Sequence, residues 1–113
     1  MVFTPTPTAP PGADFGPPPL PAVYKGNITV AGVAQANCAK CIYARINDYT
    51  SDKGDIASNV YGFIQVAPRG AGYVGRTIEF WYVDPQTGKE RKANETRAFT
   101  SGEQQLSFNL TVP

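Results

Sequence analysis

The sequence predicts an all-β fold, a small antiparallel Greek-key β-sandwich of about six or seven strands preceded by a proline-rich extended segment. Three observations predict it. Beyond residue 22, apolar and polar side chains alternate with a period of two, which is the pattern of half-buried strands. Turn-forming residues separate these segments at intervals of roughly 8–12 residues. Finally, no segment carries apolar residues at helical spacing between capping residues.

The first element along the chain is rich in proline. Eight of the eleven prolines lie in residues 1–21, at positions 5, 7, 10, 11, 17, 18, 19 and 21, together with a single charged residue, Asp14. Proline fixes φ and lacks the N–H that a helix or a ladder needs, so this stretch favours extended polyproline conformations. We therefore expect a linker or stalk over residues 1–22 and one folded domain over residues 23–113. The alternative is a proline-rich ligand for a partner domain, centred on residues 17–21.

The strands are expected where the alternation is regular. β-Branched and aromatic residues dominate these segments, as a pleated surface prefers. The segment at residues 60–66 is apolar on both faces, so its pattern does not fix which side chains point inward. The alternating segments lie at residues 28–30, 42–47, 60–66, 78–82, 92–99 and 105–112, and the turn signals at residues 31–32, 52–55, 68–70, 84–88 and 101–102.

Several of these segments also resemble a module of bacterial and archaeal cell-surface proteins. The likeness runs through residues 24–30, 44–46 and 61–63 and is closest at residues 75–83, 92–102 and 106–112. These modules are immunoglobulin-like or prealbumin-like sandwiches, similar to carboxypeptidase regulatory domains. The resemblance covers about residues 23–113 and implies a sandwich in an exported setting, and it carries no catalytic residue. The cysteine pair departs from it, since it sits where such modules have a plain turn.

The two cysteines, Cys38 and Cys41, are separated by two residues. A redox motif of this spacing needs an electropositive helix N-terminus, but here a predicted strand follows. A zinc site needs four ligands, and the chain has no histidine and no further cysteine to complete one unless two chains share the metal. The pattern therefore favours a tight disulfide across the turn, in keeping with an oxidising exterior, with free thiols as the remaining alternative.

Composition argues against several functional classes. Ten Lys and Arg residues against nine Asp and Glu residues give a net charge of +1, without the basic stripe of a nucleic-acid binder. The chain lacks an apolar run long enough to span a bilayer, so we expect no direct membrane insertion. Without histidine and without a nucleophile motif, we expect no enzyme and no cofactor. The acids Asp48, Asp52 and Asp55 share one loop, but their spacing matches no EF-hand, so we expect turn formers rather than a metal site.

Two further groups of residues are candidates for sites. Three N-x-[ST] sequons predict possible glycosylation at Asn27, Asn94 and Asn109. Tyr43 and Trp81 are expected on the outer face of the sheet, together with Tyr61 and Phe63, as a face for stacking on sugar rings or for binding a protein. In the alternative arrangement, Tyr61 and Phe63 point inward and Trp81 covers the sandwich edge.

These features together predict a non-enzymatic extracellular module, either a structural spacer or an adhesion and display domain, of a prokaryotic cell-surface protein. Its partners would be neighbouring domains of the same protein. Two alternatives belong to other classes. One is a carbohydrate- or protein-binding module that uses the aromatic face, and the other is a fibre subunit that self-associates through edge strands.

Overall fold

A computed structural model describes residues 16–34 and 37–113 of the chain. It confirms the all-β class: within these residues the regular elements are strands and one short 3-10 turn, η1 (Ala71–Tyr73). The strands are β1 (Ala22–Val30), β2 (Val33–Ala34), β3 (Asn37–Ile46), β4 (Tyr49–Thr50), β5 (Gly54–Ala57), β6 (Val60–Val66), β7 (Thr77–Val83), β8 (Glu90–Ala98), β9 (Gln104–Gln105) and β10 (Leu110–Val112).

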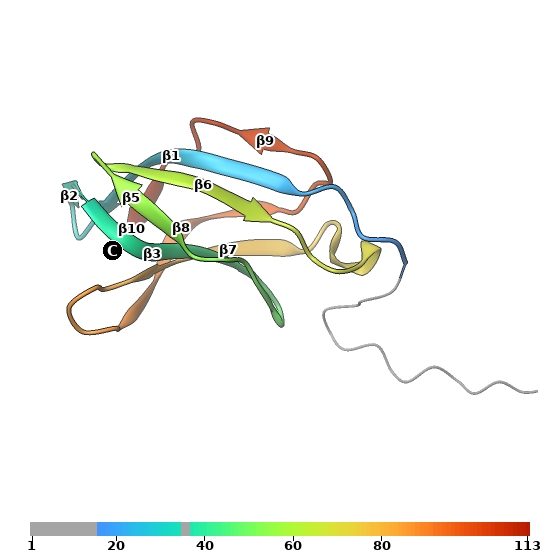
Figure 1. Cartoon of the computed structure of the whole chain (residues 1–113), viewed down its shortest axis with the longest axis horizontal. Coiled ribbons are helices and arrows are strands. Elements are labelled where there is room, and N and C mark those ends of the chain that lie inside the picture. Colours follow the sequence, from blue (N-terminus) through green and yellow to red (C-terminus); the bar gives the residue numbers. More distant parts are fainter. Residues whose placement is uncertain (1–15, 35–36) are drawn as a thin grey trace, which may run out of the picture.

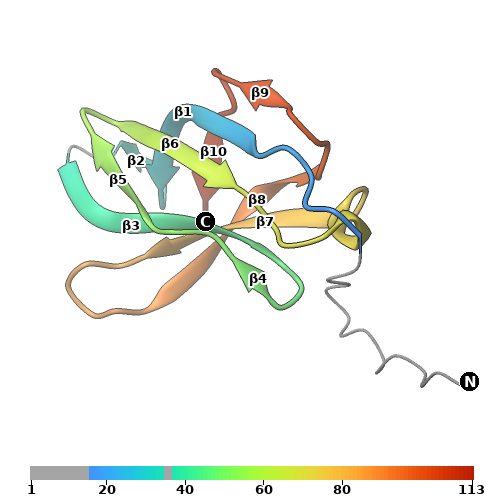
Figure 2. The ribbon, with the colours of Figure 1, turned by 45° about the vertical axis from the view of Figure 1, so that its right-hand side comes forward.

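The strands form one continuous, curled sheet in the order β10-β1-β6-β5-β3-β7-β8 (Figures 1 and 2). The curl brings the two ends of this path together, and the Thr111 N–H of β10 donates a hydrogen bond of 2.6 Å to the Glu95 carboxylate of β8. The sheet is mixed, because β1 pairs in parallel with both β9 and β10. This differs from the two separate antiparallel layers that alternation predicted, since alternation reports which face is buried and not the direction of a partner strand.

The core lies inside the curl. Inward side chains of β1, β3, β6 and β7 are buried, including Ile28, Ile42, Ile64 and Ile78, each at most 1% exposed. An aromatic cluster joins distant segments at its centre. The ring of Phe80 lies 5.4 Å from that of Tyr24 and 5.2 Å from that of Phe108. Burial of such side chains, at about 1.5–3 kcal/mol each, is the main stabilising contribution to the fold.

Two short turns set the path of the chain around β1 and β6. Ala31 and Gly32 connect β1 to β2 with φ values of 53° and 80°, and Ser58 and Asn59 connect β5 to β6 with φ values of 51° and 67°. Two consecutive left-handed residues are the signature of the type I′ hairpin turn, whose twist suits the flanking strands. Gly32 tolerates this conformation because it lacks a β-carbon.

The prediction that Tyr61 belongs to an outer aromatic face is wrong, because its side chain is fully buried. The reason is a bulge in β6. Tyr24 pairs with Ile64 and Gly26 pairs with Tyr61, so two residues of β1 span three of β6. The extra residue turns both Tyr61 and Ile64 inward, while Phe63 between them is 61% exposed. Phe63 therefore faces outward, as the first arrangement predicted, and Tyr61 faces inward, as the alternative arrangement predicted.

The boundaries also differ from prediction in three places. β5 begins at Gly54, inside the expected turn at residues 52–55, and it carries the buried Ile56. The expected long last strand is instead β9 and β10 with a turn between them, and Leu106 in that turn is 57% exposed. At the start of the domain, the Leu20 N–H donates to Ser101 Oγ at 2.8 Å, so ordered contacts precede residue 23. Residues 1–15 of the expected linker lie outside the described residues.

Candidate functional site

The outer face of β3, β7 and β8 carries an aromatic patch made of Tyr43, Arg45 and Trp81. Tyr43 and Trp81 lie directly opposite each other in the β3–β7 register. The Arg45 guanidinium carbon lies 4.8 Å from the Trp81 ring centroid and 5.7 Å from that of Tyr43. Contacts of this kind between a cation and a ring contribute about 0.5–1 kcal/mol at exposed positions. The patch forms because alternation places all three residues on the same side of neighbouring strands.

Charged side chains of β8 and β7 hold the patch in place. The Tyr43 hydroxyl donates to Glu90 Oε1 at 2.6 Å and accepts from Arg45 Nη2 at 2.8 Å. Burial first, and then the hydrogen bond to Glu90, raise the pKa of Tyr43 to about 12, so this phenol stays protonated near neutral pH. On the other side, Trp81 Nε1 donates to Glu79 at 3.2 Å, and Lys92 lies 3.5 Å from the same carboxylate.

This network limits the access of a ligand to the Tyr43 and Trp81 rings. Tyr43 is only 4% exposed, because Arg45 and Lys53 cover its ring, and Trp81 is half-buried. A sugar that stacked on either ring would have to move Arg45 and break its bond to the Tyr43 hydroxyl. Tyr43 and Trp81 therefore lie together on one face of the sheet, but their rings are already covered by the protein's own cations.

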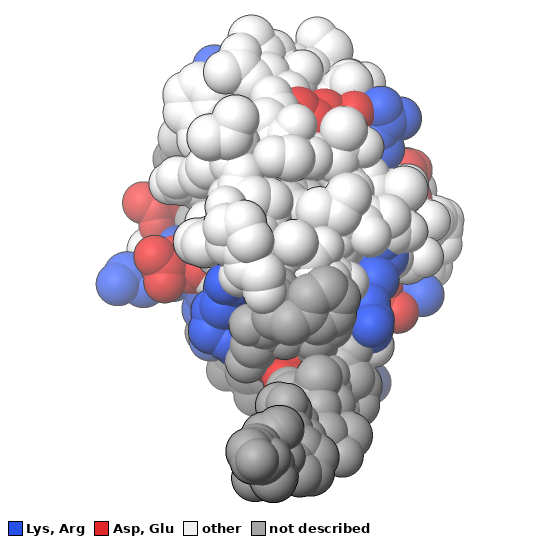
Figure 3. Space-filling model, turned by 90° about the vertical axis from the view of Figure 1, so that its right-hand side faces the viewer, with Lys and Arg blue, Asp and Glu red and all other residues white. Residues whose placement is uncertain are grey.

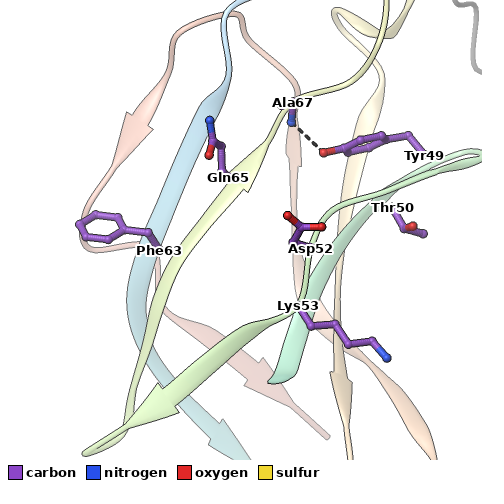
Figure 4. Close-up of a pocket in the computed structure, with 7 residues that line it drawn as sticks. All are labelled: Tyr49, Thr50, Asp52, Lys53, Phe63, Gln65 and Ala67. Carbon is purple, nitrogen blue, oxygen red and sulfur yellow. Dashed lines mark hydrogen bonds between the residues drawn. The ribbon is translucent and has the colours of Figure 1, made fainter. Parts of the chain in front are cut away.

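A shallow hollow of about 460 Å³ lies between β6 on one side and β4 with the segment that follows it on the other (Figure 4). One bond closes its upper end, where the Ala67 N–H donates to the Tyr49 hydroxyl at 2.8 Å. Phe63 and Lys53 point to opposite sides of it. The Lys25 ammonium lies 5.1 Å from the Phe63 ring. The lining residues are Tyr49, Thr50, Asp52, Lys53, Phe63, Gln65 and Ala67.

Phe63 and Trp81, which the sequence grouped in one face, belong to different strands of the curled sheet and to different surroundings. Phe63 of β6 lies over β1 and borders the hollow, whereas Trp81 of β7 is covered by Arg45. The link between the two areas is Lys53, which lines the hollow and lies 5.9 Å from the Tyr43 ring.

The cysteine pair forms a disulfide, with the two Cα atoms 6.0 Å apart. It closes a bulge in β3, because Cys38 pairs with Ile56 and Ile42 pairs with Gly54, leaving extra residues on β3. Lys40 within this bulge has a φ of 54°, and its N–H donates to Asp55 Oδ1 at 2.7 Å. A disulfide of this kind indicates a protein that resides outside the reducing cytoplasm.

Polar side chains at the start of β1 form an arrangement that sequence reasoning missed. The buried Tyr24 hydroxyl donates to Glu103 Oε1 at 2.7 Å, and Arg97 forms a bidentate pair with the same carboxylate. Glu103 is 11% exposed, and the hydrogen bonds from Arg97 hold its pKa at about 2. Nothing in the sequence around Glu103 signals this partner, because Tyr24 lies 79 residues earlier.

The sequons and acids are distributed over the surface. Asn27, Asn94 and Asn109 are all exposed, and Asn109 Oδ1 accepts a hydrogen bond of 2.9 Å from the Asn27 N–H. Of the three loop acids, Asp48 accepts from the Tyr73 hydroxyl and Asp55 from Lys40, while Asp52 lines the hollow. Among the described residues, no three acidic or cysteine side chains gather as metal ligands would.

The surface charge is mixed at the end of the molecule where β1 begins. Figure 3 shows blue and red side chains next to one another around the edges of this face, with uncharged residues over much of its middle. In the part of the chain that the structure covers, no helix has the length and apolar character needed to cross a membrane.

Comparisons with family models, with curated proteins and with solved structures gave no match to this chain. The resemblance to immunoglobulin-like and prealbumin-like surface modules therefore remains a prediction.

Proposed function

We propose that this chain is a non-enzymatic structural module of an exported protein, a spacer or display domain that holds its neighbours apart at a cell surface. In this proposal the module works through its shape and its two points of attachment. The immunoglobulin-like or prealbumin-like character inferred from the sequence is part of the same proposal.

The observation that carries it is the position of the two ends of the fold. The chain enters the sheet at Ala22, the first residue of β1, and leaves it at Val112. Val112 pairs with Val30, the last residue of β1, because β10 runs parallel to β1. Entry and exit thus lie at opposite ends of β1, about 26 Å apart at the usual rise of a strand. Figure 1 shows the two ends on opposite sides of the molecule. Ends placed in this way suit a module joined in series to others.

One property supports the exported setting, and another supports the role of a rigid spacer. The Cys38–Cys41 disulfide persists in oxidising compartments and is rare in the cytosol. The buried side-chain nitrogen and oxygen atoms of the described residues all have hydrogen-bond partners, as expected for a rigid, closed core.

The test uses intact cells that carry the natural protein. We expect added protease to release the parent protein from the surface, and we expect its Cys38 and Cys41 to resist alkylation until a reductant is added. A parent protein that is protected from protease until lysis, with both thiols alkylated at once, would overturn the proposal.

A second candidate function is recognition of a glycan or a protein through the aromatic patch and the adjoining hollow. The observation that favours it is the exposure of Phe63 beside a hollow with polar lining, which Lys53 links to the Tyr43 ring of the aromatic patch. Trp81 is the one tryptophan of the chain, so its fluorescence reports on Arg45 displacement. Titration with a glycan panel should shift this signal, and an unchanged spectrum throughout would exclude stacking on Trp81. Phe63→Ala would separate binding at the hollow from binding at the patch.

Self-association through edge strands has weaker support. β8, at one end of the sheet path, is rich in charged residues, including Arg91, Lys92 and Arg97, which oppose pairing with a second copy. The other end, β10, lies beside Glu95 of β8. A concentration-dependent dimer in sedimentation equilibrium would support this alternative, and a monomer throughout would remove it.

A further inference from the structure

We infer that this module is built to bear tension along its length, and that the parallel pairing of residues 20–31 with residues 101–112, here called the terminal pairing, is the element that resists the load. The inference rests on the proposed function, because only a module joined at both ends would be pulled in this way. It adds a mechanical role to the spacing role.

The terminal pairing begins before β1. The Leu20 N–H donates to Ser101 Oγ at 2.8 Å, and the Gly102 N–H donates to the Leu20 carbonyl at 3.1 Å. The Val23 N–H donates to the Glu103 carbonyl at 2.8 Å, and β9 then continues the parallel ladder. Residues near the start of the described chain are thus hydrogen-bonded to a segment about 80 residues later in the sequence.

The pairing continues through the middle of β1 to its end. The Phe108 N–H donates to the Lys25 carbonyl at 2.8 Å, and the Asn27 N–H donates to Asn109 Oδ1 at 2.9 Å. β10 pairs with β1 from Ile28 to Val30, and the Ala31 N–H donates to the Val112 carbonyl at 2.8 Å. The bonds therefore follow β1 along its whole length.

Side chains secure the pairing from the inside. The Tyr61 hydroxyl donates to the Phe108 carbonyl from β6, on the other side of β1. At the entry end, Glu103 accepts from the Tyr24 hydroxyl and pairs with Arg97. Gly26 lets the two backbones approach closely, because a β-carbon there would lie 2.3 Å from the Phe108 carbonyl oxygen. These contacts resist the sliding of residues 101–112 along β1.

The direction of the load decides how these bonds break. Tension on the N-terminal side pulls β1 toward its own start, and tension on the C-terminal side pulls β10 toward its own end. Because the two strands are parallel neighbours, the forces run along the strands in opposite directions and load the hydrogen bonds together. A pull from one end of the pair would instead open the bonds one after another, each with a net contribution of about 1 kcal/mol.

Single-molecule force spectroscopy on the oxidised chain tests this directly with two attachment geometries. In the first, handles are attached at the two termini. In the second, one handle is attached at the C-terminus and the other at Val33, which is 61% exposed just after the β1–β2 turn, through Val33→p-azidophenylalanine so that the native disulfide is untouched. The second geometry peels β10 from β1, and we expect its unfolding force to be lower by roughly twofold or more, because the bonds then fail in sequence.

A matched pair of variants locates the resistance. Asn109→Ala removes the side-chain bond to Asn27, whereas Asn94→Ala removes an exposed asparagine of β8 outside the terminal pairing. We expect Asn109→Ala to lower the force in the terminal geometry and Asn94→Ala to leave it unchanged. Equal unfolding forces in the two geometries would overturn the inference. That result would leave the spacer proposal intact, because surface exposure and the oxidised cysteines are measured separately on intact cells.

Discussion

Two regions of this molecule are held together in different ways. The terminal pairing joins segments about 80 residues apart, mainly through backbone hydrogen bonds between parallel strands, with side-chain bonds from Ser101 and Asn109 added. The face formed by β3, β7 and β8 is antiparallel, and outer side chains link its strands through Tyr43, Trp81 and their charged partners. The first region depends on a close approach of two backbones, and the second on side chains that can adjust. We therefore expect the first to be the less tolerant of substitution.

The largest effect is expected where the two regions meet. Phe80 of β7 contacts Tyr24 of β1 and Phe108 of the C-terminal segment and is fully buried. Phe80→Ala should lower the free energy of unfolding by about 4 kcal/mol, measured by urea denaturation, because it leaves a cavity at the centre of the core. A loss below about 1 kcal/mol would mean that Phe80 does not join the two regions.

Substitution of Gly26 should break the terminal pairing selectively. Because the added β-carbon would meet the Phe108 carbonyl oxygen at 2.3 Å, Gly26→Ala should cost about 2–3 kcal/mol of unfolding free energy. Gly62→Ala in neighbouring β6 is the control, since its nearest contact would be an ordinary 3.5 Å to the Asp55 carbonyl oxygen. Equal losses for the two variants would contradict the close approach of residues 26 and 108.

Removal of the disulfide tests how much this bond stabilises the start of β3, which belongs to the second region. It closes a short loop, so its removal by Cys38→Ser with Cys41→Ser should cost about 2 kcal/mol, the low end of the usual range. Reduction of the wild-type chain should give the same loss in denaturant unfolding. A reduced chain as stable as the oxidised one would show that the bulge in β3 does not need the bond.

The smallest expected effect is a dependence on pH at the entry end. The pKa of Glu103 is lowered from 4.5 to about 2 in the folded chain, first by the hydrogen bonds from Arg97. A lowered pKa stabilises the fold at pH values above 4.5, and this stabilisation is lost as the pH falls from about 4.5 toward 2. Since Arg97 is partly exposed to solvent, we expect the loss to be only about 1 kcal/mol.

The variant Glu103→Gln isolates this contribution, because it keeps the shape of the side chain and removes its charge. Unfolding measured across pH 2–7 should show a smaller acid loss in the variant than in the wild type, by about 1 kcal/mol. Identical pH profiles would mean that other acidic groups account for the whole acid sensitivity.

The same contrast explains what sequence analysis predicts here. Alternation identifies parts of β3 and β7, including the inward positions of Ile42 and Phe80 and the outer face that carries Tyr43 and Trp81. It does not predict that these two residues lie directly opposite each other. Alternation succeeds because regular antiparallel strands with one buried face alternate apolar and polar residues, so the sequence shows which side chains point inward.

The period of two in the sequence does not predict the terminal pairing or the bulges. The bulge in β6 turns the Tyr61 side chain from the outer to the inner face, and no residue type in the sequence signals it. β5 begins inside a stretch of turn-forming residues. The parallel partner of β1 depends on contacts across almost the whole chain, and Glu103 finds Tyr24 in the same way. Local patterns do not reveal such distant partners. Alternation therefore predicts the all-β class but not the parallel pairs that make the curled sheet mixed.

Native-state amide hydrogen exchange tests whether the first and last segments of the fold are bonded in parallel along β1. The informative protons are the N–H groups of Val23, Phe108 and Ala31, which donate to Glu103, Lys25 and Val112 outside the regular ladders. We predict that all three exchange as slowly as amides of β3 and β7, with protection approaching that of global unfolding. Rapid exchange at these three positions, with β3 and β7 still protected, would show that the terminal pairing does not form.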